Sequence, residues 1–205
     1  EYQLHRAMRP AEILDYLVRG EVLVHRVVIP EGTSSREIGA ILEKGNILKA
    51  ETFYQTAQDR EIVKRLGFEA ETLEGYLFPD TYYFSKQTAP EKIVDQMTKK
   101  FRETYDEAFQ KQANALGMNQ REIITLASII EKETGAPSER RIISGVFHNR
   151  LKRKMRLQSD PTVIFSLAHF DGDIKRTDLL NDSPYTTYRV TGLPPGPISN
   201  PGKEA

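Results

Sequence analysis

Two glutamates, Glu131 and Glu133, end an apolar run that begins at Ile123 and reads I-I-T-L-A-S-I-I-E-K-E-T. On a helical wheel of about 100° per residue, both lie at the borders of the apolar arc and outside the middle of the polar face. A carboxyl group placed there is partly buried at the C-terminal end of a helix, where the dipole disfavours negative charge. Burial and the dipole both raise the pKa of a carboxyl group, as a general acid near neutral pH requires. The run therefore predicts a candidate acid, without choosing between the two glutamates.

The element that must position these carboxylates is a mostly buried helix. Asn119 and Glu122, three residues apart, form a start signal of the capping-box kind. Gly135, followed by Pro137, forms a stop signal. The alternative is an amphipathic core helix with a solvated E-K-E end, since charge runs are usually solvated. Opposite the apolar arc, the wheel places Thr125, Ser128 and Lys132.

The composition argues against several classes of function. The 205 residues include 29 Lys+Arg and 29 Asp+Glu, so the formal net charge is zero and no basic excess favours nucleic acid. Cysteine is absent, which excludes disulfides and thiolate metal sites. The four histidines are scattered without metal-ligand spacing, so neither a metal nor another cofactor is expected.

The sequence contains no apolar run long enough to span a bilayer, and no signal peptide is visible. The chain begins at Glu1 and not at a methionine, and it ends with P-G-K-E-A. We therefore expect it to be a piece of a longer protein. The 205 residues themselves suit one large domain or two small ones.

The first part of the chain predicts a small unit of strands with short helices between them. Stacked aromatics in the segment 73–84 can serve either as core packing or as a platform for sugar rings. Helices are expected over residues 10–19, over 34–44 with Ser34 and Glu37 as a capping box, and over 51–66 with a break near Asp59. A strand is expected over residues 22–29, and an extended segment with a bend over 73–84.

The second part predicts mainly helices. The proline- and glycine-rich run V-T-G-L-P-P-G-P-I-S-N-P-G reads as a rigid surface loop, and its residues 193–201 are expected to wall one side of a groove. Helices are expected over residues 90–116 with a kink, over the central run, over 139–153 with Ser138 as cap, and briefly from Pro161. The predicted fold class is α+β.

Five sequence blocks occur together and in order along the chain. Together they closely resemble the MltG/YceG family of endolytic murein transglycosylases, and the resemblance covers nearly the whole chain. The blocks are L-E-G-Y-L-F-P-D-T-Y at 73–82, A-S-I-I-E-K-E-T at 127–134, V-F-H-N-R-L at 146–151, L-Q-S-D-P-T-V at 157–163, and Y-T-T-Y…T-G-L-P-P-G-P-I-S-N-P-G at 185–202.

The resemblance implies a small LysM-like α/β N-terminal portion over residues 1–86 and a mainly helical catalytic portion over 87–205 that is truncated at its C-terminal end. It implies cleavage of the β-1,4 bond between N-acetylmuramic acid and N-acetylglucosamine within nascent peptidoglycan strands. The product carries a 1,6-anhydro-muramyl end, and no water is consumed. In the block A-S-I-I-E-K-E-T, the family's catalytic residue falls on Glu131.

The resemblance also implies a location and partners. The family is anchored in the bacterial inner membrane by one N-terminal helix, which this chain lacks, with the catalytic part facing the periplasm or cell wall. Peptidoglycan strands are the expected partner, and peptidoglycan synthases of the penicillin-binding-protein type are candidate protein partners. One departure is Thr186, where the family often has Asn, which puts a role for Thr186 in doubt.

Other side chains in the five blocks are candidates for binding the glycan. Gln158 is a candidate for hydrogen-bonding an N-acetyl group. Asp160 either binds glycan or caps the helix at Pro161, and Glu74 either touches sugar or orients the central helix. The three tyrosines are candidate stacking surfaces, with core packing as the alternative. The candidate substrate-binding residues are Glu74, Tyr76, Tyr82, Gln158, Ser159, Asp160, Tyr185, Thr187 and Asn200.

Two arginines are further candidates for binding the substrate. Arg140 and Arg150 are candidates for contacting muramyl or peptide carboxylates, although arginines on helix surfaces are mostly solvated.

Three other functions remain as alternatives to the transglycosylase. They are a glycan-binding module without catalysis, a scaffold for septal synthases, and a hydrolytic muramidase. A muramidase needs a second carboxylate beside Glu131, for which the candidates are Asp160, Glu133 and Glu74.

Overall fold

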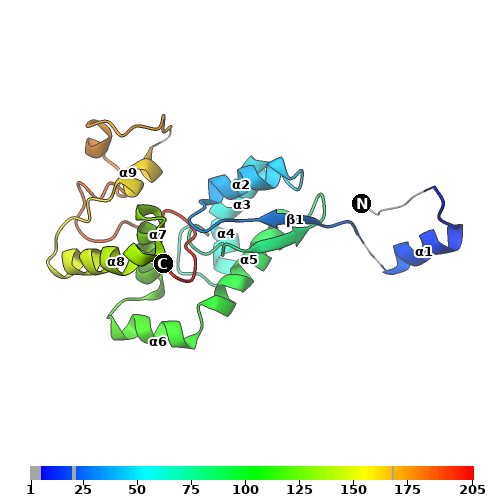
Figure 1. Ribbon diagram of the computed structural model, residues 1–205, viewed down its shortest axis with the longest axis horizontal. Helices are drawn as coiled ribbons and strands as arrows, with labels where there is room; N and C mark the ends of the chain where they lie inside the picture. The colour runs from blue at the N-terminus through cyan, green and yellow to red at the C-terminus, as the bar shows by residue number, and fades with distance from the viewer. Residues whose placement is uncertain (1–5, 20–21, 168) are drawn as a thin grey trace.

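The computed structural model of the chain describes residues 6–19, 22–167 and 169–205. These residues form mainly helices and a small two-stranded sheet, which agrees with the predicted α+β class. Figure 1 shows the helix α1 (Pro10–Arg19), which buries none of its residues, standing apart from the rest of the molecule. No helix in the described ranges is both long and apolar enough to cross a membrane.

The sheet joins the two aromatic and β-branched segments of the first part of the chain. β1 (His25–Val28) pairs antiparallel with β2 (Thr81–Phe84), and the register sets Val27 opposite Tyr82. Both side chains are buried while their neighbours along the strands are more exposed, which is the alternation of a sheet with one covered face. In the structure, the strand predicted over residues 22–29 is shorter and comprises His25–Val28.

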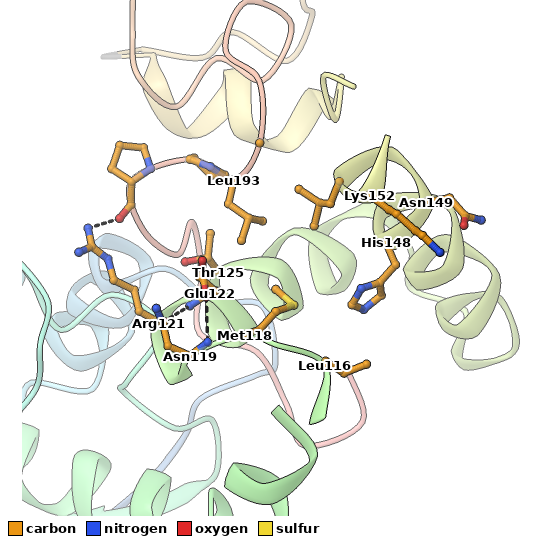
Figure 2. A pocket seen from close by; sticks show the side chains of 14 residues that line it. Leu116, Met118, Asn119, Arg121, Glu122, Thr125, His148, Asn149, Lys152 and Leu193 are labelled. Carbon is orange, nitrogen blue, oxygen red and sulfur yellow. Dashed lines mark hydrogen bonds between the residues drawn. The ribbon is translucent and has the colours of Figure 1, made fainter. Parts of the chain in front are cut away.

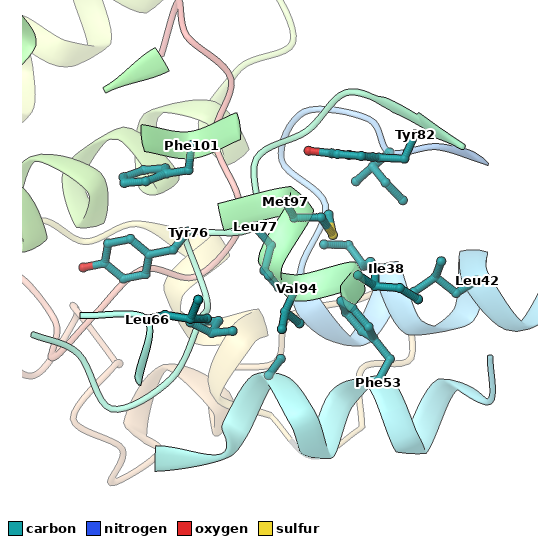
Figure 3. Packing of buried hydrophobic residues seen from close by; sticks show 14 of the residues in the cluster. Ile38, Leu42, Phe53, Leu66, Tyr76, Leu77, Tyr82, Val94, Met97 and Phe101 are labelled. Atoms are coloured by element: carbon teal, nitrogen blue, oxygen red, sulfur yellow. The ribbon is translucent and has the colours of Figure 1, made fainter. Parts of the chain in front are cut away.

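Short helices pack in one buried cluster with this sheet, and two of them begin at side-chain caps. α2 (Ser35–Lys44) begins with the predicted capping box of Ser34 and Glu37. The predicted break at Asp59 is confirmed, because this residue ends α3 (Ala50–Gln58) and its carboxylate caps α4 (Arg60–Arg65). The first cluster of buried side chains lies among these elements (Figure 3), and it includes Ile38, Leu42, Phe53, Leu77, Tyr82, Val94 and Met97.

The helix predicted over residues 90–116 is interrupted. α5 (Pro90–Thr104) ends before Asp106, whose carboxylate accepts the N–H groups at the start of α6 (Glu107–Ala115). α5 packs against α3 in the first cluster. The predicted domain boundary after residue 86 falls between β2 and α5, so the first cluster continues across it; the boundary itself stays a prediction.

The central helix α7 (Gln120–Glu133) separates two groups of buried side chains. Asn119 and Glu122 form the predicted capping box at its start. Its Ile124 belongs to the first cluster. The second cluster takes Leu126, Ile129 and Ile130 from α7, together with Phe147, Leu157 and Ile198.

The predicted polar side of α7 is wrong at two positions. Thr125 and Ser128 are buried, and the loop of residues 193–202 forms hydrogen bonds with Ser128. The Ser128 hydroxyl accepts the N–H of Ile198 at 3.0 Å, and its carbonyl oxygen accepts the Ser199 hydroxyl at 3.2 Å. Small hydroxyl side chains can be buried when their hydrogen bonds are satisfied in this way.

Two further helices pack beside α7. α8 (Pro137–Lys152) begins one residue before the predicted cap Ser138, because Pro137 occupies the first helical position. α9 (Asp160–Ser166) begins at Asp160 with Ser159 in the cap position, so of the two interpretations of Asp160 the cap is wrong, and glycan binding stays a prediction. A single 3-10 turn, η1 (Asp178–Leu180), interrupts the loop-rich C-terminal segment.

Candidate active site

Glu131 lies in the last turn of α7 with only 6% of its side chain exposed. Arg140 of α8 donates from Nη2 to its Oε1 at 2.9 Å. The backbone N–H of Gly202, in the C-terminal loop, donates to Oε2 at 3.0 Å. Helices α7 and α8 and the C-terminal loop therefore meet at this one carboxyl group.

The turn of residues 30–32 supplies a fourth segment. Gly32 has a φ of +73°, and a Cβ built on it would lie 3.2 Å from Cγ of Glu131, so glycine allows the turn to reach the catalytic candidate. Its N–H donates to the carbonyl oxygen of Asn200 at 2.9 Å. The adjacent Glu31 places Oε2 at 3.4 Å from Nη2 of Arg140.

Glu31 is the residue that the sequence reasoning missed. Residues 30–32 read only as a turn, and Glu31 lies 100 positions from Glu131 in the chain. The local signal was weak: a charged residue held between Pro30 and Gly32, which both restrict the backbone.

Glu133, the second candidate acid, lies in a different environment. The residue is exposed, and its Oε1 accepts a hydrogen bond from the Ser159 hydroxyl. Ser159 is buried, and its N–H donates to the hydroxyl of Thr187 at 3.0 Å. Thr187 is buried and shares a 2.8 Å hydroxyl contact with Thr162. The structure thus brings the blocks at 157–163 and 185–188 together beside the end of α7.

Gln158 and Asp160 flank this buried serine and are exposed. Gln158 has a φ of +52°, a left-handed conformation that costs a residue with a Cβ roughly 1 kcal/mol. Oδ1 of Asp160 accepts the Tyr188 hydroxyl at 2.7 Å. That hydrogen bond is the main cause that raises the pKa of Tyr188 to about 12.

Glu74 lies inside the protein, 5% exposed. Its carboxyl group accepts the N–H of Ser35 at 3.1 Å, the Ser35 hydroxyl at 2.6 Å and Nδ2 of Asn200 at 3.0 Å. Burial raises the pKa of Glu74 to about 7, and the donors from Ser35 and Asn200 oppose that rise. These contacts match the alternative in which Glu74 orients other segments, and its contact with sugar stays a prediction.

Asn200 is fully buried and joins segments from both ends of the chain. Its Oδ1 accepts the N–H groups of Gly75 and Leu77, each at 2.9 Å. Its Nδ2 donates to the carbonyl oxygen of Thr33 at 2.9 Å as well as to Glu74. Every polar atom of the side chain has a protein partner, so its expected contact with glycan stays a prediction.

The three candidate tyrosines lie in packed surroundings. Tyr76 and Tyr82 are buried in the first cluster (Figure 3), and the Tyr82 hydroxyl donates to the carbonyl oxygen of Phe78 at 2.6 Å. Tyr185 is partly buried, with its ring 4.9 Å from that of Phe165. Core packing accounts for these positions, and sugar stacking stays a prediction.

A cavity of about 790 Å³ opens at the other end of α7, between its capping box and the end of α8. Figure 2 shows Leu193 from the proline-rich loop on one side and His148 and Lys152 of α8 on the other. The loop is fastened here by Arg121, which donates to the carbonyl oxygen of Pro195. The proline-rich loop therefore walls this cavity, whose lining does not include Glu131.

Comparison with known proteins agrees with the resemblance in the five blocks. The YceG-like family matches residues 1–205. A Bacillus subtilis protein named endolytic murein transglycosylase is 32% identical over 98% of this chain, and one from Streptococcus pneumoniae serotype 2 with the same name is 28% identical over the whole chain. The crystal structure of a yceG-like protein from Listeria monocytogenes is 34% identical over 99% of this chain, with a TM-score of 0.80.

The chain spans 60% of the length of the Bacillus subtilis relative, 42% of the Streptococcus pneumoniae relative and 72% of the Listeria monocytogenes chain. The match to the family covers every residue, and the likeness in structure covers nearly all of the chain. The prediction made from the five blocks is thus confirmed, and the chain belongs to the YceG-like family.

Proposed function

We propose that this protein is an endolytic peptidoglycan lytic transglycosylase, with Glu131 as its single general acid and base. The observation that carries the proposal is the position of Glu131, nearly buried where α7, α8, the turn 30–32 and the C-terminal loop meet. Glu133 in the same block is exposed. The names of the two bacterial relatives supply the substrate class.

The reaction needs only one protein carboxyl group because the substrate supplies the nucleophile. Protonated Glu131 donates its proton to the glycosidic oxygen as the bond from that oxygen to the muramyl C1 breaks. The resulting carboxylate accepts the proton of the muramyl C6 hydroxyl, whose oxygen attacks C1. A 1,6-anhydro-muramyl end forms, no water is consumed, and Glu131 is protonated again. Proximity of the C6 hydroxyl replaces a second carboxylate.

The two hydrogen-bond donors at Glu131 suit the stage of the reaction between its two proton transfers. After the first proton transfer, the carboxylate is an anion with little access to water. Arg140 and the N–H of Gly202 then stabilise it with hydrogen bonds, which are strong when the acceptor is charged.

The test is mass spectrometry of peptidoglycan strands treated with the full-length protein and with its Glu131→Gln variant. We expect internal cuts with 1,6-anhydro-muramyl ends from the unaltered protein. The Gln variant should lose this activity by about 10²-fold or more, since that is the usual contribution of general acid–base catalysis. Glu133→Gln is the matched control, and it should still form anhydro ends.

Each other outcome identifies one of the alternatives. Reducing ends in place of anhydro ends mean hydrolysis, with a second carboxylate at work. Binding without cleavage by the folded protein means a glycan-binding module, and a folded Glu131→Gln variant that still cleaves would remove Glu131 from the mechanism.

We infer further that the exposed side chain of Gln158 binds an N-acetyl group of the glycan, with Ser159, Asp160, Thr187 and Tyr185 shaping the same wall. Two observations support this. Gln158 keeps a strained backbone where glycine would fit without cost, and strain of this kind gathers at functional sites. Its neighbour Ser159 ties the wall to Glu133, two residues beyond Glu131.

The wider setting is also a proposal, supported by the family. We infer a LysM-like role for residues 1–86, a catalytic portion from residue 87, and anchoring of the full-length protein in the inner membrane by one N-terminal helix. The catalytic part would face the periplasm or cell wall, close to peptidoglycan synthases. Protease digestion of intact spheroplasts tests this orientation, because only a domain outside the membrane is cleaved.

A further inference from the structure

One guanidinium lies between two carboxylates that are 100 positions apart in the chain. Nη2 of Arg140 is 2.9 Å from Oε1 of Glu131 and 3.4 Å from Oε2 of Glu31. The Arg140 side chain is 12% exposed, and its buried Nε has no hydrogen-bond partner among the residues that the structure describes. Arg140 is therefore held mainly by these two acids.

The turn of residues 30–32 and the C-terminal loop bring the Glu31 carboxyl group close to Arg140 and leave it partly exposed to water. A Cβ on Gly202 would overlap the Glu31 carboxyl group, so glycine leaves room for Glu31 in its present position. The neighbouring Gly32 contacts Glu131, which fixes the turn that carries Glu31. The side chain of Glu31 is 49% exposed, against 6% for Glu131. Glu31 thus keeps its charge at low cost in water.

These contacts create a conflict that the proposed reaction must resolve. Arg140 donates to Glu131 at 2.9 Å and so is placed to bind the carboxylate that forms after the first proton transfer, whereas the first chemical step needs Glu131 protonated. A protonated Glu131 would leave the Arg140 charge largely buried, with no ionised partner on α7. Glu31 is the neighbouring anion that Arg140 can pair with in that state.

We propose that Glu31 is a positioning residue of the transglycosylase, which acts by taking Arg140 away from Glu131 whenever Glu131 carries the proton. The inference rests on the proposed function. Arg140 pairs with Glu31 before proton donation, moves toward Glu131 when that carboxylate is ionised, and returns after the C6 proton arrives. Glu31 exchanges no proton with the substrate.

The experiment measures kcat and KM of the full-length protein on uncrosslinked glycan strands, from the release of anhydro ends. Glu31→Gln removes the charge and keeps the shape, so it should lower kcat about tenfold, a part of the general-acid contribution, and leave KM within about twofold. Glu31→Asp keeps the charge and should recover most of the kcat. Glu43→Gln, on the exposed side of α2, is the control and should behave as the unaltered protein.

The variant Arg140→Gln shows whether Glu31 acts through the arginine. If it does, adding Glu31→Gln to Arg140→Gln should cause no further loss of kcat, since the two changes interrupt one interaction. A normal kcat in Glu31→Gln, equal losses in the Gln and Asp variants, or losses that multiply in the double variant would each overturn the proposal. Absence of anhydro ends from the unaltered protein would instead overturn the proposed function.

Discussion

Among the residues that the structure describes, Glu74 and Glu131 have largely buried side chains, and they have different neighbours. Glu131 meets a guanidinium and a backbone N–H, so a negative charge on it is compensated. Glu74 meets a serine and an asparagine, which carry no charge, and burial raises its pKa to about 7. The first environment suits chemistry, whereas the second holds backbone segments together.

The raised pKa of Glu74 makes stability depend on pH. Below about pH 4.5, the ordinary pKa, Glu74 is protonated in both the folded and unfolded chain and its contribution to stability is complete. As pH rises toward 7, the unfolded chain ionises first, so the free energy of unfolding falls, by about 3 kcal/mol from this group. Glu74→Gln should flatten that slope in denaturant titrations between pH 4.5 and 7. An unchanged slope would contradict the assignment.

The strained backbone of Gln158 allows stability and binding to be separated. Gln158→Gly should keep or raise the melting temperature, because glycine adopts the φ of +52° without a steric cost. The same change removes the side chain proposed to bind an N-acetyl group, so KM for glycan should rise while kcat falls little. Gln158→Ala should raise KM in the same way without the gain in stability. A normal KM in both variants would remove Gln158 from the binding site.

At the scale of elements, α7 is placed by loops that arrive from distant parts of the chain. The loop 193–202 covers its Ser128, and Gly75 of the first aromatic block lies against both Pro197 of that loop and Ile124 of α7. A Cβ on Gly75 would overlap Pro197 and lie 2.9 Å from Cγ2 of Ile124. Bare backbone at Gly75 is thus what allows three segments to meet.

Replacing Gly75 therefore tests this contact. Gly75→Ala should lower the free energy of unfolding by about 2–4 kcal/mol, from the positive φ of +89° and from overpacking together. Gly117→Ala is the matched control, because Gly117 also has a positive φ of +69° but faces open space. It should cost only about 1 kcal/mol. Equal losses in chemical denaturation would mean that the close approach at Gly75 contributes nothing.

The same scale explains which elements could be predicted from the sequence. The two capping boxes and the break at Asp59 are local signals, and the structure has them as predicted. The cap predicted at Ser138 is wrong because Pro137 occupies the first helical position, and the cap interpretation of Asp160 is wrong because α9 already begins at that residue. The burial of Ser128 depends on a loop 70 positions away, which no helical wheel contains.

At the scale of the whole molecule, the site joins residues that the sequence keeps far apart. The five blocks predicted the family, and in it Glu131, but the wheel could not choose between two glutamates. Glu31 and Gly202 lie 100 and 71 positions from Glu131, and their contacts with it or with Arg140 arise only from folding. Sequence reasoning therefore reached the candidate acid and missed most of its surroundings.

Asn200 joins the C-terminal loop to two segments of the first part of the chain, so its replacement should lower the stability of the whole fold. Asn200→Ala would leave the N–H groups of Gly75 and Leu77 without their acceptor and remove the side-chain donor to Glu74. We expect a fall of about 3 kcal/mol or more in the free energy of unfolding, measured with denaturant. Asn200→Asp should also destabilise, because it sets a carboxylate against Glu74. Full stability in both variants would show that the junction is not needed.

The two clusters of buried side chains share one wall, because α7 gives Ile124 to the first and Ile129 to the second. We therefore expect that neither cluster melts while the other keeps its packing, even though the sequence predicts two portions. Differential scanning calorimetry of residues 22–205 should give a single peak whose calorimetric and van't Hoff enthalpies agree. Heating would then unfold both clusters and the site around Glu131 at one temperature, and no partly folded form would retain the site.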